Sequence, residues 1–449
     1  MKPVLLVDFG STNTKATAVD VENCEILGTA AAYTTVETDI NNGLHDAIQI
    51  LEKTTGHLEF GETYACSSAA GGLKMISCGL VPELTAQASR EASLGAGAKV
   101  WKTYSFQLTK GDMKEIEEYH PDIILLTGGT DGGNTDCILY NAKMLAGLSY
   151  DCPVVIAGNR CCADDCQEIL AGRTTYICEN VMPRLGELNI EPTQKQIREI
   201  FLNRIVQGKG LTQAMDLMSG IIMPTPSAML TAMELLSDGW DEIPGIGELV
   251  GVDLGGATTD VYSVAEGSPA NTMTVIKGLQ EPYTKRTVEG DIGMRYSVRG
   301  IMEAAGDRKL AKIAGLARNK VNELVDYLEH HTDYIPDSEE MEKMDYALAC
   351  AAVETAVAAC RFSGTGLYPS GLTFVQSGKD LRRVKYVVVT GGALIHAKHT
   401  EEIAKYALFD ESSPASLRPE KAEILVDRKY ILAAMGLLSK QYPRLPWKS

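Results

Sequence analysis

The sequence predicts an α/β fold built from two halves with a shared layout. Apolar stretches such as "DIILL" and "YVVV" are continuous and alternate with helical patterns, which is typical of mainly parallel sheets covered on both faces. A strand, a glycine-containing turn and a returning strand occur at 4–19 and again at 249–264. A strand that ends in Thr-Gly-Gly also occurs in each half, at 127–129 and at 390–392, and this repetition indicates internal duplication.

The first half alternates strand and helix patterns. Apolar residues after Asn42 recur at helical spacing, and Pro82 marks the start of another helix because proline is favoured in a first helical turn. The other elements expected here are the hairpin 4–19, a strand in "GLKMISCGL", the strand that ends at Thr127, a helix from Thr135, and strands in "PVVIAGN" and "TTYIC".

A helical region with several prolines precedes the second half. The second half then predicts the hairpin 249–264, a strand at 272–277, helices at 293–305, 308–331 and 342–360, a strand at 386–390 and a helix at 429–440. We therefore expect an N-terminal lobe over 1–190, a helical, proline-containing connection or subdomain over 191–248, and a C-terminal lobe over 249–449.

Composition bounds the class of protein. The chain has 449 residues, more than one ordinary core holds, so two or more domains are expected. A net charge of -17 argues against nucleic acid and anionic membrane surfaces as partners, but backbone N–H groups can bind a nucleotide without a basic surface. Because the sequence has neither a signal-peptide pattern nor a run of ~18 apolar residues, we expect a cytoplasmic protein.

Eleven cysteines are present, and five of them lie between 152 and 178. Their positions are Cys152, Cys161, Cys162, Cys166 and Cys178. Metal sites usually use two separate pairs of cysteines with two to four residues between partners, and this segment lacks that spacing. The pattern favours reduced thiols and leaves an iron–sulfur site as the alternative.

The first hairpin carries the residues for a phosphate site. Gly10 allows the backbone to approach a ligand closely, so that N–H groups of Ser11, Thr12 and Asn13 can donate to phosphate oxygens. Asp8 would repel phosphate directly, but it can hold a hydrated Mg²⁺ that bridges to the β- and γ-phosphates. Lys15 would add positive charge.

The second hairpin repeats this pattern. Asp253 ends the strand, as Asp8 does, and the turn contains Gly255, Gly256, Ala257, Thr258 and Thr259. Two such hairpins facing each other would bind the phosphates of ATP or ADP from both sides. Either Asp8 or Asp253 would order the attacking water, with Asp260 less favoured for that role. The turn Gly391-Gly392-Ala393 would support the adenosine, whereas we expect a structural or interdomain role for "TGGTDGG" at 127–133.

These motifs resemble the superfamily of actin, 70-kDa heat-shock chaperones and sugar kinases. The resemblance rests on the segments "VDFGSTNTK", "GVDLGGATTD" and "VVVTGGA", which occur in that order. "EGDIGMR" at 289–295 takes the place of a chaperone loop that Gly290 and Asp291 match. The resemblance implies two RNase-H-like lobes around a central nucleotide cleft, with Asp8 and Asp253 positioning Mg²⁺, Thr12 and Lys15 meeting phosphate, and Gly391–Ala393 backing the adenosine.

Together with "DIILLTGGTDGGN" and "VEGDIGMR", the hairpins resemble more closely the glutamate mutase accessory proteins of MutL or GlmL type. This resemblance implies a slow, Mg²⁺-dependent ATPase that reactivates an adenosylcobalamin-dependent mutase. The alternatives are a small-molecule kinase of the same fold, an ATP-dependent redox activator with an iron–sulfur cluster, and a scaffold without activity. The sequence leaves the oligomeric state open.

Overall fold

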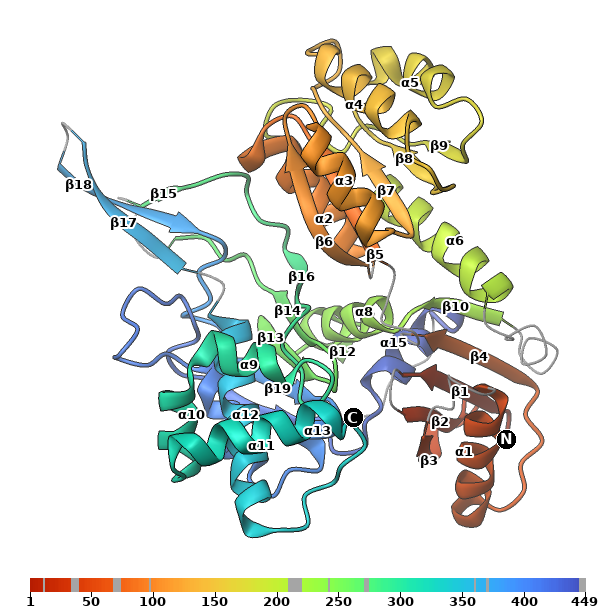
Figure 1. The fold of residues 1–449 in the computed structure, drawn as a ribbon. Coiled ribbons are helices and arrows are strands. Elements are labelled where there is room, and N and C mark those ends of the chain that lie inside the picture. Colours follow the sequence, from red (N-terminus) through yellow and green to blue (C-terminus); the bar gives the residue numbers. More distant parts are fainter. Residues whose placement is uncertain are drawn as a thin grey trace. The chain divides into compact units, whose positions relative to one another are not determined.

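The computed structural model describes residues 1–10, 13–33, 40–67, 74–96, 98–208, 220–240, 243–269, 274–358, 361–368 and 371–443. The chain divides into two compact units (Figure 1). Unit 1 comprises Met1–Ala70, Gln213–Ile276 and Glu281–Ser449, and unit 2 comprises Gly71–Thr212 with Lys277–Gln280. These units do not coincide with the three consecutive segments expected from the sequence, because the chain leaves unit 1 after its first strands and returns to it later.

Unit 1 contains two five-stranded sheets. The first has the order β10-β4-β1-β2-β3, with β1 (Pro3–Phe9), β2 (Asn13–Asp20), β3 (Glu25–Tyr33), β4 (Glu62–Ser67) and β10 (Gly220–Pro224). β1 and β2 are antiparallel, as are β2 and β3, whereas β4 runs parallel to both β1 and β10. Helix α1 (Ile40–Thr55) connects β3 to β4.

The second sheet repeats this topology with different strands. Its order is β16-β14-β13-β19-β20, from β13 (Leu249–Leu254), β14 (Thr259–Val264), β16 (Thr284–Glu289), β19 (Tyr386–Thr390) and β20 (Glu423–Val426). The antiparallel and parallel pairings match those of the first sheet strand for strand. A central hairpin, a third antiparallel strand and two parallel strands on the other side define the RNase-H-like arrangement, so the predicted fold class and duplication are confirmed.

Two helices join the sheets of unit 1 into one core. α8 (Thr225–Asp238) and α15 (Leu432–Gln441) pack against each other, and their apolar side chains share a cluster with both sheets. This cluster includes Leu6 from the first sheet, Val264 from the second sheet, and Met233 and Leu437 from the two helices. A methyl group on Gly436 of α15 would overlap the carbonyl oxygen of Ala228 on α8, so glycine permits the close approach.

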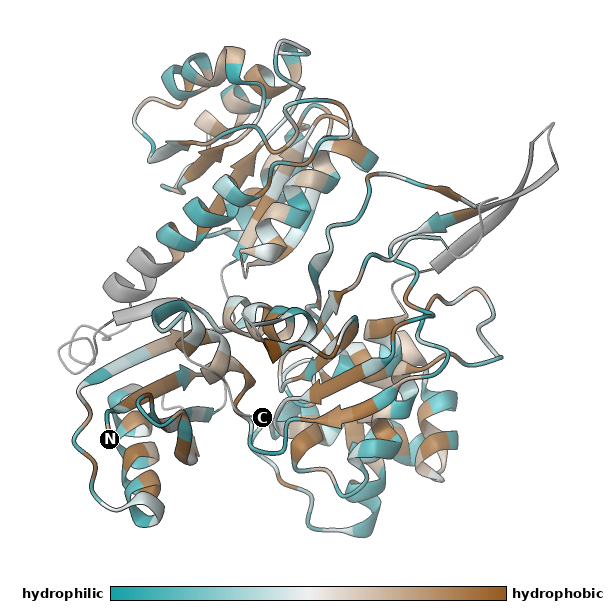
Figure 2. Cartoon of the chain, turned by 180° about the vertical axis from the view of Figure 1, so that it is seen from behind, coloured by the Kyte–Doolittle hydropathy of each residue, from teal (hydrophilic) through white to brown (hydrophobic). Residues whose placement is uncertain are grey.

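The remaining elements of unit 1 cover the second sheet or extend from it. They are α9 (Val298–Ala305), α10 (Asp307–Ala314), α11 (Arg318–His330), α12 (Glu339–Val357), α13 (Gly392–Ile395), α14 (Thr400–Ala404), η3 (Lys405–Ala407), and strands β11 (Gly239–Trp240), β12 (Ile243–Pro244), β15 (Thr274–Ile276), β17 (Arg361–Tyr368) and β18 (Gly371–Ser377). Figure 2 shows apolar residues concentrated on the strands and on one side of the helices.

Unit 2 has a separate, wholly parallel sheet of order β6-β5-β7-β8-β9. Its strands are β5 (Lys74–Gly79), β6 (Lys99–Ser105), β7 (Ile123–Leu126), β8 (Val154–Ile156) and β9 (Thr175–Ile177), and its helices are η1 (Pro82–Ala86), α2 (Gln87–Gly95), α3 (Lys110–Tyr119), α4 (Asp136–Ala146), η2 (Arg160–Cys162), α5 (Ala163–Ile169) and α6 (Glu191–Gly208). Cys78, Ile124 and Leu145 belong to its buried core.

This sheet corrects one sequence inference. Thr127-Gly128-Gly129 follow β7 in unit 2, whereas Thr390 ends β19 and Gly391-Gly392 follow it in unit 1. By topology, the counterpart of β19 in the first sheet is β4. The two Thr-Gly-Gly turns are therefore not equivalent members of the duplication, because similar strand-to-helix turns arise in any parallel sheet.

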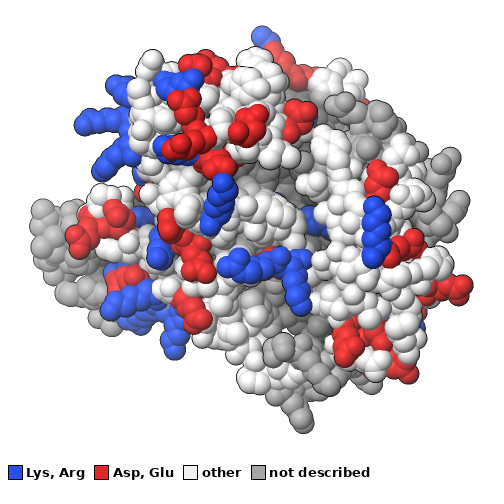
Figure 3. Space-filling model, turned by 90° about the horizontal axis from the view of Figure 1, so that it is seen from below, with Lys and Arg blue, Asp and Glu red and all other residues white. Residues whose placement is uncertain are grey.

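The helices and the surface charges bear on membranes and nucleic acid as partners. Among the described residues, no helix is both long enough and apolar enough to cross a membrane. On the face drawn in Figure 3, basic and acidic side chains are interspersed.

The close contact of α8 with α15 generates a stability prediction. Exchange of Gly436→Ala would force the two helices apart, and overpacking of this kind destabilises by roughly 1–3 kcal/mol. Gly111→Ala is the matched control, because Gly111 lies exposed in α3 with room for a methyl group. Thermal unfolding should show a lower midpoint for Gly436→Ala and an unchanged or higher one for Gly111→Ala; equal midpoints would contradict the packing.

Candidate functional site

The first hairpin presents Asp8 and Lys15 side by side. They are paired residues of β1 and β2, and the Lys15 ammonium lies 2.9 Å from Asp8 Oδ2. Asp8 is buried, and the backbone N–H of Gly10 donates to Asn13 O at 3.1 Å and closes the turn. Ser11 and Thr12, two of the predicted phosphate-binding residues, lie outside the described residues.

The second hairpin has the same closing bond. The N–H of Gly255 donates to Thr258 O at 3.0 Å, and Asp253 stands opposite Asp260, as Asp8 stands opposite Lys15. Both glycines lie two residues after the aspartate of their strand. The two hairpins are therefore equivalent in backbone geometry as well as in sequence.

The backbone of the second turn is held from behind. Met294 N–H donates to Gly255 O, and Arg295 and Tyr296 N–H groups donate to Gly256 O at 2.9 Å. No hydrogen-bond acceptor within the described part of the chain meets the N–H groups of Gly256, Ala257 and Thr258. Thr259 instead serves the structure, because it is fully buried and its hydroxyl donates to Ile292 O at 2.9 Å.

The adenosine turn borders the second hairpin directly. Gly391 has a φ of 94°, and a Cβ atom there would lie only 2.7 Å from Asp253 Oδ1. At Gly392 a Cβ atom would meet nothing within 4 Å, and both Gly392 and Ala393 are partly exposed. The turn therefore offers open backbone next to Asp253, as an adenosine support would require.

The aspartates and Lys15 share one electrostatic environment. Burial, followed by the neighbouring carboxylate of Asp260, raises the pKa of Asp253 to about 7. Lys15 partly offsets this effect, and Asp8 adds to it. Burial alone would lower the pKa of Lys15, but the Asp8 carboxylate raises it above the usual value, so Lys15 stays charged. Asp8 and Lys15 form an ion pair, and the charges of both act on Asp253.

Sequence reasoning missed a group that holds Asp8. The hydroxyl of Thr225 donates to Asp8 Oδ1 at 2.5 Å, and the thiol of Cys66 lies 3.6 Å from the same oxygen. Thr225 is the first residue of α8, between two prolines that fix the helix start. The prolines predict a helix N-terminus there, but only the fold shows that it meets β1, more than two hundred residues away in sequence.

A second missed group surrounds Lys15. Its ammonium lies 3.4 Å from the centre of the Tyr430 ring, a cation–π contact, and Tyr430 has a φ of 55°. Asp427 fixes this segment by accepting hydrogen bonds from the Thr390 hydroxyl at 3.1 Å and from Ile431 N–H at 3.0 Å. No motif signals these residues, because the β20–α15 connection meets the site only after folding.

Asp260 is occupied elsewhere. Its Oδ1 accepts from Arg286 Nε at 2.8 Å and Nη2 at 2.7 Å, and both side chains are buried in the β14–β16 pair. Because Asp260 is engaged by Arg286, it is less available than Asp8 or Asp253 to order a water molecule. Its charge still acts on Asp253 across the hairpin.

The cysteine-rich segment lies in unit 2, around β8, α5 and β9. Cys162 and Cys166 are buried, and burial raises the pKa of Cys166 to about 12, so this thiol stays protonated at neutral pH. In the described ranges, no three or more His, Cys, Asp or Glu side chains form a group that could hold a metal ion.

Comparison with known protein families shows to which family this chain belongs. The model of the MutL protein family matches residues 4–448. The chain belongs to the MutL family. It is also 48% identical, over 99% of its length and 97% of the relative, to the protein MutL of Clostridium tetanomorphum. The resemblance to the accessory-protein family is thereby confirmed.

Solved structures align over most of the chain at low identity. They include (R)-2-hydroxyglutaryl-CoA dehydratase component A of Acidaminococcus fermentans (11% identity, 97% and 96% of the two chains, TM-score 0.32), the 2-hydroxyisocaproyl-CoA dehydratase activator of Clostridium difficile with bound ADPNP (8%, 99% and 95%, TM-score 0.34), and a xylulose kinase of Lactobacillus acidophilus (10%, 100% and 91%, TM-score 0.35). With TM-scores this low, the alignments carry no argument about this chain. The fold class follows from the strand order of the two sheets in unit 1.

The raised pKa of Asp253 predicts a pH-dependent stability. An aspartate with a native pKa of about 7 binds an extra proton in the folded state between about pH 4 and 7, so its contribution to stability falls as pH rises through that range. Asp253→Asn, which stays neutral, should raise the unfolding midpoint of the nucleotide-free protein more at about pH 8 than at about pH 5.

Asp20→Asn supplies a control of opposite sign. Burial opposes the ionisation of Asp20, but backbone N–H groups of Lys2 and Glu22 donate to it and lower its pKa. Its contribution is present above the unfolded pKa and lost in acid, so Asp20→Asn should destabilise at about pH 8. A gain for Asp253→Asn that is the same at both pH values would refute the assignment.

Proposed function

We propose that this protein binds ATP and ADP with Mg²⁺ between its two hairpins, hydrolyses ATP slowly, and serves as a reactivating, chaperone-like accessory protein of an adenosylcobalamin-dependent mutase of glutamate mutase type. The observation that supports nucleotide binding is the pair of equivalent turns, each closed by one N–H···O bond and each following a buried or half-buried aspartate. Membership of the MutL family supports the accessory role.

Within this proposal the turn N–H groups hold phosphate. Gly256, Ala257 and Thr258 would donate from one side, and Ser11, Thr12 and Asn13 from the other. Lys15 would neutralise phosphate charge, because it remains protonated beside Asp8. Gly391, Gly392 and Ala393 would support the adenosine.

The donor set fits a hydrated Mg²⁺. Asp253 is half-buried, and its side chain has no hydrogen-bond partner among the described residues, which points to a missing partner. Asp8 already accepts from Lys15 and Thr225, so it is oriented before a ligand arrives. Carboxylates that act through metal-bound waters suit Mg²⁺, which retains much of its hydration shell, and the ion would neutralise charge on the transferred phosphate.

The chain's own residues then order the nucleophile. Asp253, with its pKa near 7, would accept a hydrogen bond from the attacking water and take its proton. Thr225 would fix the carboxylate of Asp8 so that it does not rotate away. Binding of ATP would draw the two hairpins together, and loss of the γ-phosphate would release them, which shifts a two-state equilibrium that a partner can sense.

Calorimetry and hydrolysis assays test the nucleotide site. MgATP and MgADP should bind, and Asp8→Asn should lower turnover by about 10²-fold or more while the protein still binds nucleotide. Asp136→Asn, an exposed carboxylate of unit 2, is the control and should change neither. Absence of nucleotide binding by the wild-type protein would reject the proposal, and phosphate transfer to an added acid or sugar in preference to water would favour a kinase.

Thr225 gives a more selective test. Thr225→Val keeps the side-chain shape and removes the donor to Asp8 Oδ1, so we expect turnover to fall about tenfold at unchanged overall secondary structure. Thr29→Val makes the same exchange at an exposed position of β3 and should leave turnover as it is. Equal turnover of the two variants would show that Thr225 does not position Asp8.

The partner is tested by co-purification. A tagged form of the protein should retain an adenosylcobalamin-dependent mutase to different extents with MgATP and with MgADP. Equal retention with and without nucleotide would contradict coupling, and no retention at all would contradict the accessory role.

A further inference from the structure

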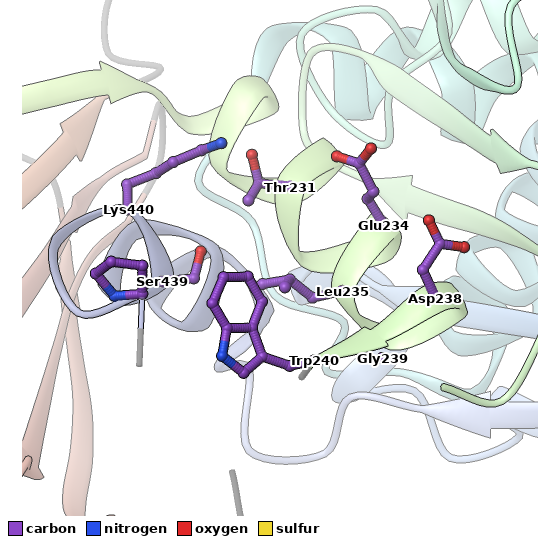
Figure 4. A pocket seen from close by; sticks show the side chains of 9 residues that line it. Thr231, Glu234, Leu235, Asp238, Gly239, Trp240, Ser439 and Lys440 are labelled. Carbon is purple, nitrogen blue, oxygen red and sulfur yellow. The ribbon is translucent and has the colours of Figure 1, made fainter. Parts of the chain in front are cut away.

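A pocket of about 340 Å³ lies in unit 1, and its lining includes no residue of either hairpin (Figure 4). It opens between the last turns of α8 and α15 and the short strand β11. The lining residues are Thr231, Glu234, Leu235, Asp238, Gly239, Trp240, Ser439, Lys440 and Pro443. The volume falls within the range of pockets that bind small molecules.

Opposite charges line different elements of this pocket. Glu234 and Asp238 are one turn apart on α8, so their carboxylates emerge on the same side of the helix. Lys440 comes from α15, and Figure 4 shows its ammonium directed toward Thr231. Tyr283 fixes Asp238 by donating its hydroxyl to Oδ1 at 3.0 Å.

Part of the remaining wall is apolar, and the hydroxyl residues Thr231 and Ser439 complete it. The half-buried indole of Trp240 covers one side, and Leu235 and Pro443 supply aliphatic surface. Lys440 would attract the carboxylate of a ligand, and Glu234 and Asp238 would attract its ammonium group. A molecule that carries both charges and a short apolar group matches all three walls.

The pocket is joined to the nucleotide site by a single helix. α8 begins at Thr225, whose hydroxyl holds Asp8, and ends at Asp238 in the pocket. Fourteen residues of α-helix span roughly 21 Å and move as one element. Close packing of Gly436 against Ala228 couples the shift of either helix to the other.

We propose that this pocket binds a small zwitterion of the α-amino acid class, with its carboxylate toward Lys440, its ammonium toward Glu234 and Asp238, and its side chain against Trp240. Occupancy then changes ATP turnover through α8 and Thr225. Only this second part rests on the proposed ATPase function, because binding itself needs no nucleotide.

Trp240 provides the binding signal. The chain has three tryptophans, so the variant Trp101→Phe/Trp447→Phe leaves Trp240 as the single indole. Titration of nucleotide-free protein with L-leucine and L-glutamate should give a saturable fluorescence change with at least one of them. The matched single-charge probes, isoamylamine and 4-methylpentanoate, should bind at least about tenfold more weakly than L-leucine.

Charge variants locate the site. Lys440→Gln and Asp238→Asn should each weaken amino-acid binding by about fivefold or more, and Lys114→Gln, at an exposed position of α3, should not. No fluorescence change with any common L-amino acid up to about 10 mM would overturn the site, as would equal binding of the single-charge probes.

The coupling has its own readout. Addition of the bound amino acid should change the ATP turnover of the wild-type protein at least about twofold, and Lys440→Gln should abolish this response while it keeps basal turnover. Fluorescence binding without any effect on a measurable turnover would overturn the coupling. If the protein hydrolysed no ATP, the proposed function would fail, and fluorescence would still decide the site.

Discussion

The arrangement depends on a buried carboxylate that cannot stand alone. Asp8 is the penultimate residue of β1 and is buried inside unit 1, where an unpaired negative charge would be strongly unfavourable. Lys15, Thr225 and the Cys66 thiol surround it, and these groups come from β2, α8 and β4. Since each partner belongs to a different element, the hairpin, the helix start and the neighbouring strand must all be in place before the charge is compensated.

Duplication explains why the site has two unequal halves. Both sheets supply the same hairpin, and both turns close with the same bond, but the residue opposite the aspartate differs. Lys15 compensates Asp8 in the first hairpin, whereas Asp260 stands opposite Asp253 in the second and is itself bound by Arg286. Asp8 is therefore paired with a cation, whereas burial and the facing carboxylate of Asp260 raise the pKa of Asp253.

Much of this could be predicted from the sequence. Asp-x-Gly turns after apolar strands predicted both hairpins, their carboxylates and the α/β class, because turn chemistry and strand hydrophobicity are local properties. The helix expected at 342–360 is equally local and occurs as α12, which starts a little earlier because Ser338 caps it by accepting a hydrogen bond from Met341 N–H at 3.4 Å. Long-range partners could not be predicted. Thr225 and Tyr430 have no motif, β10 is too short to distinguish from a loop, and the Thr-Gly-Gly turn of β7 looks like that of β19 although it belongs to another sheet.

The central claim is that both hairpins hold one nucleotide. A crystal structure of the protein with Mg²⁺ and a non-hydrolysable ATP analogue tests it most directly. The account predicts the triphosphate between the turn that starts at Gly10 and the turn that starts at Gly255, with the metal within one water of Asp8 and Asp253. A nucleotide bound elsewhere, or phosphates that contact only one of the two turns, would contradict it.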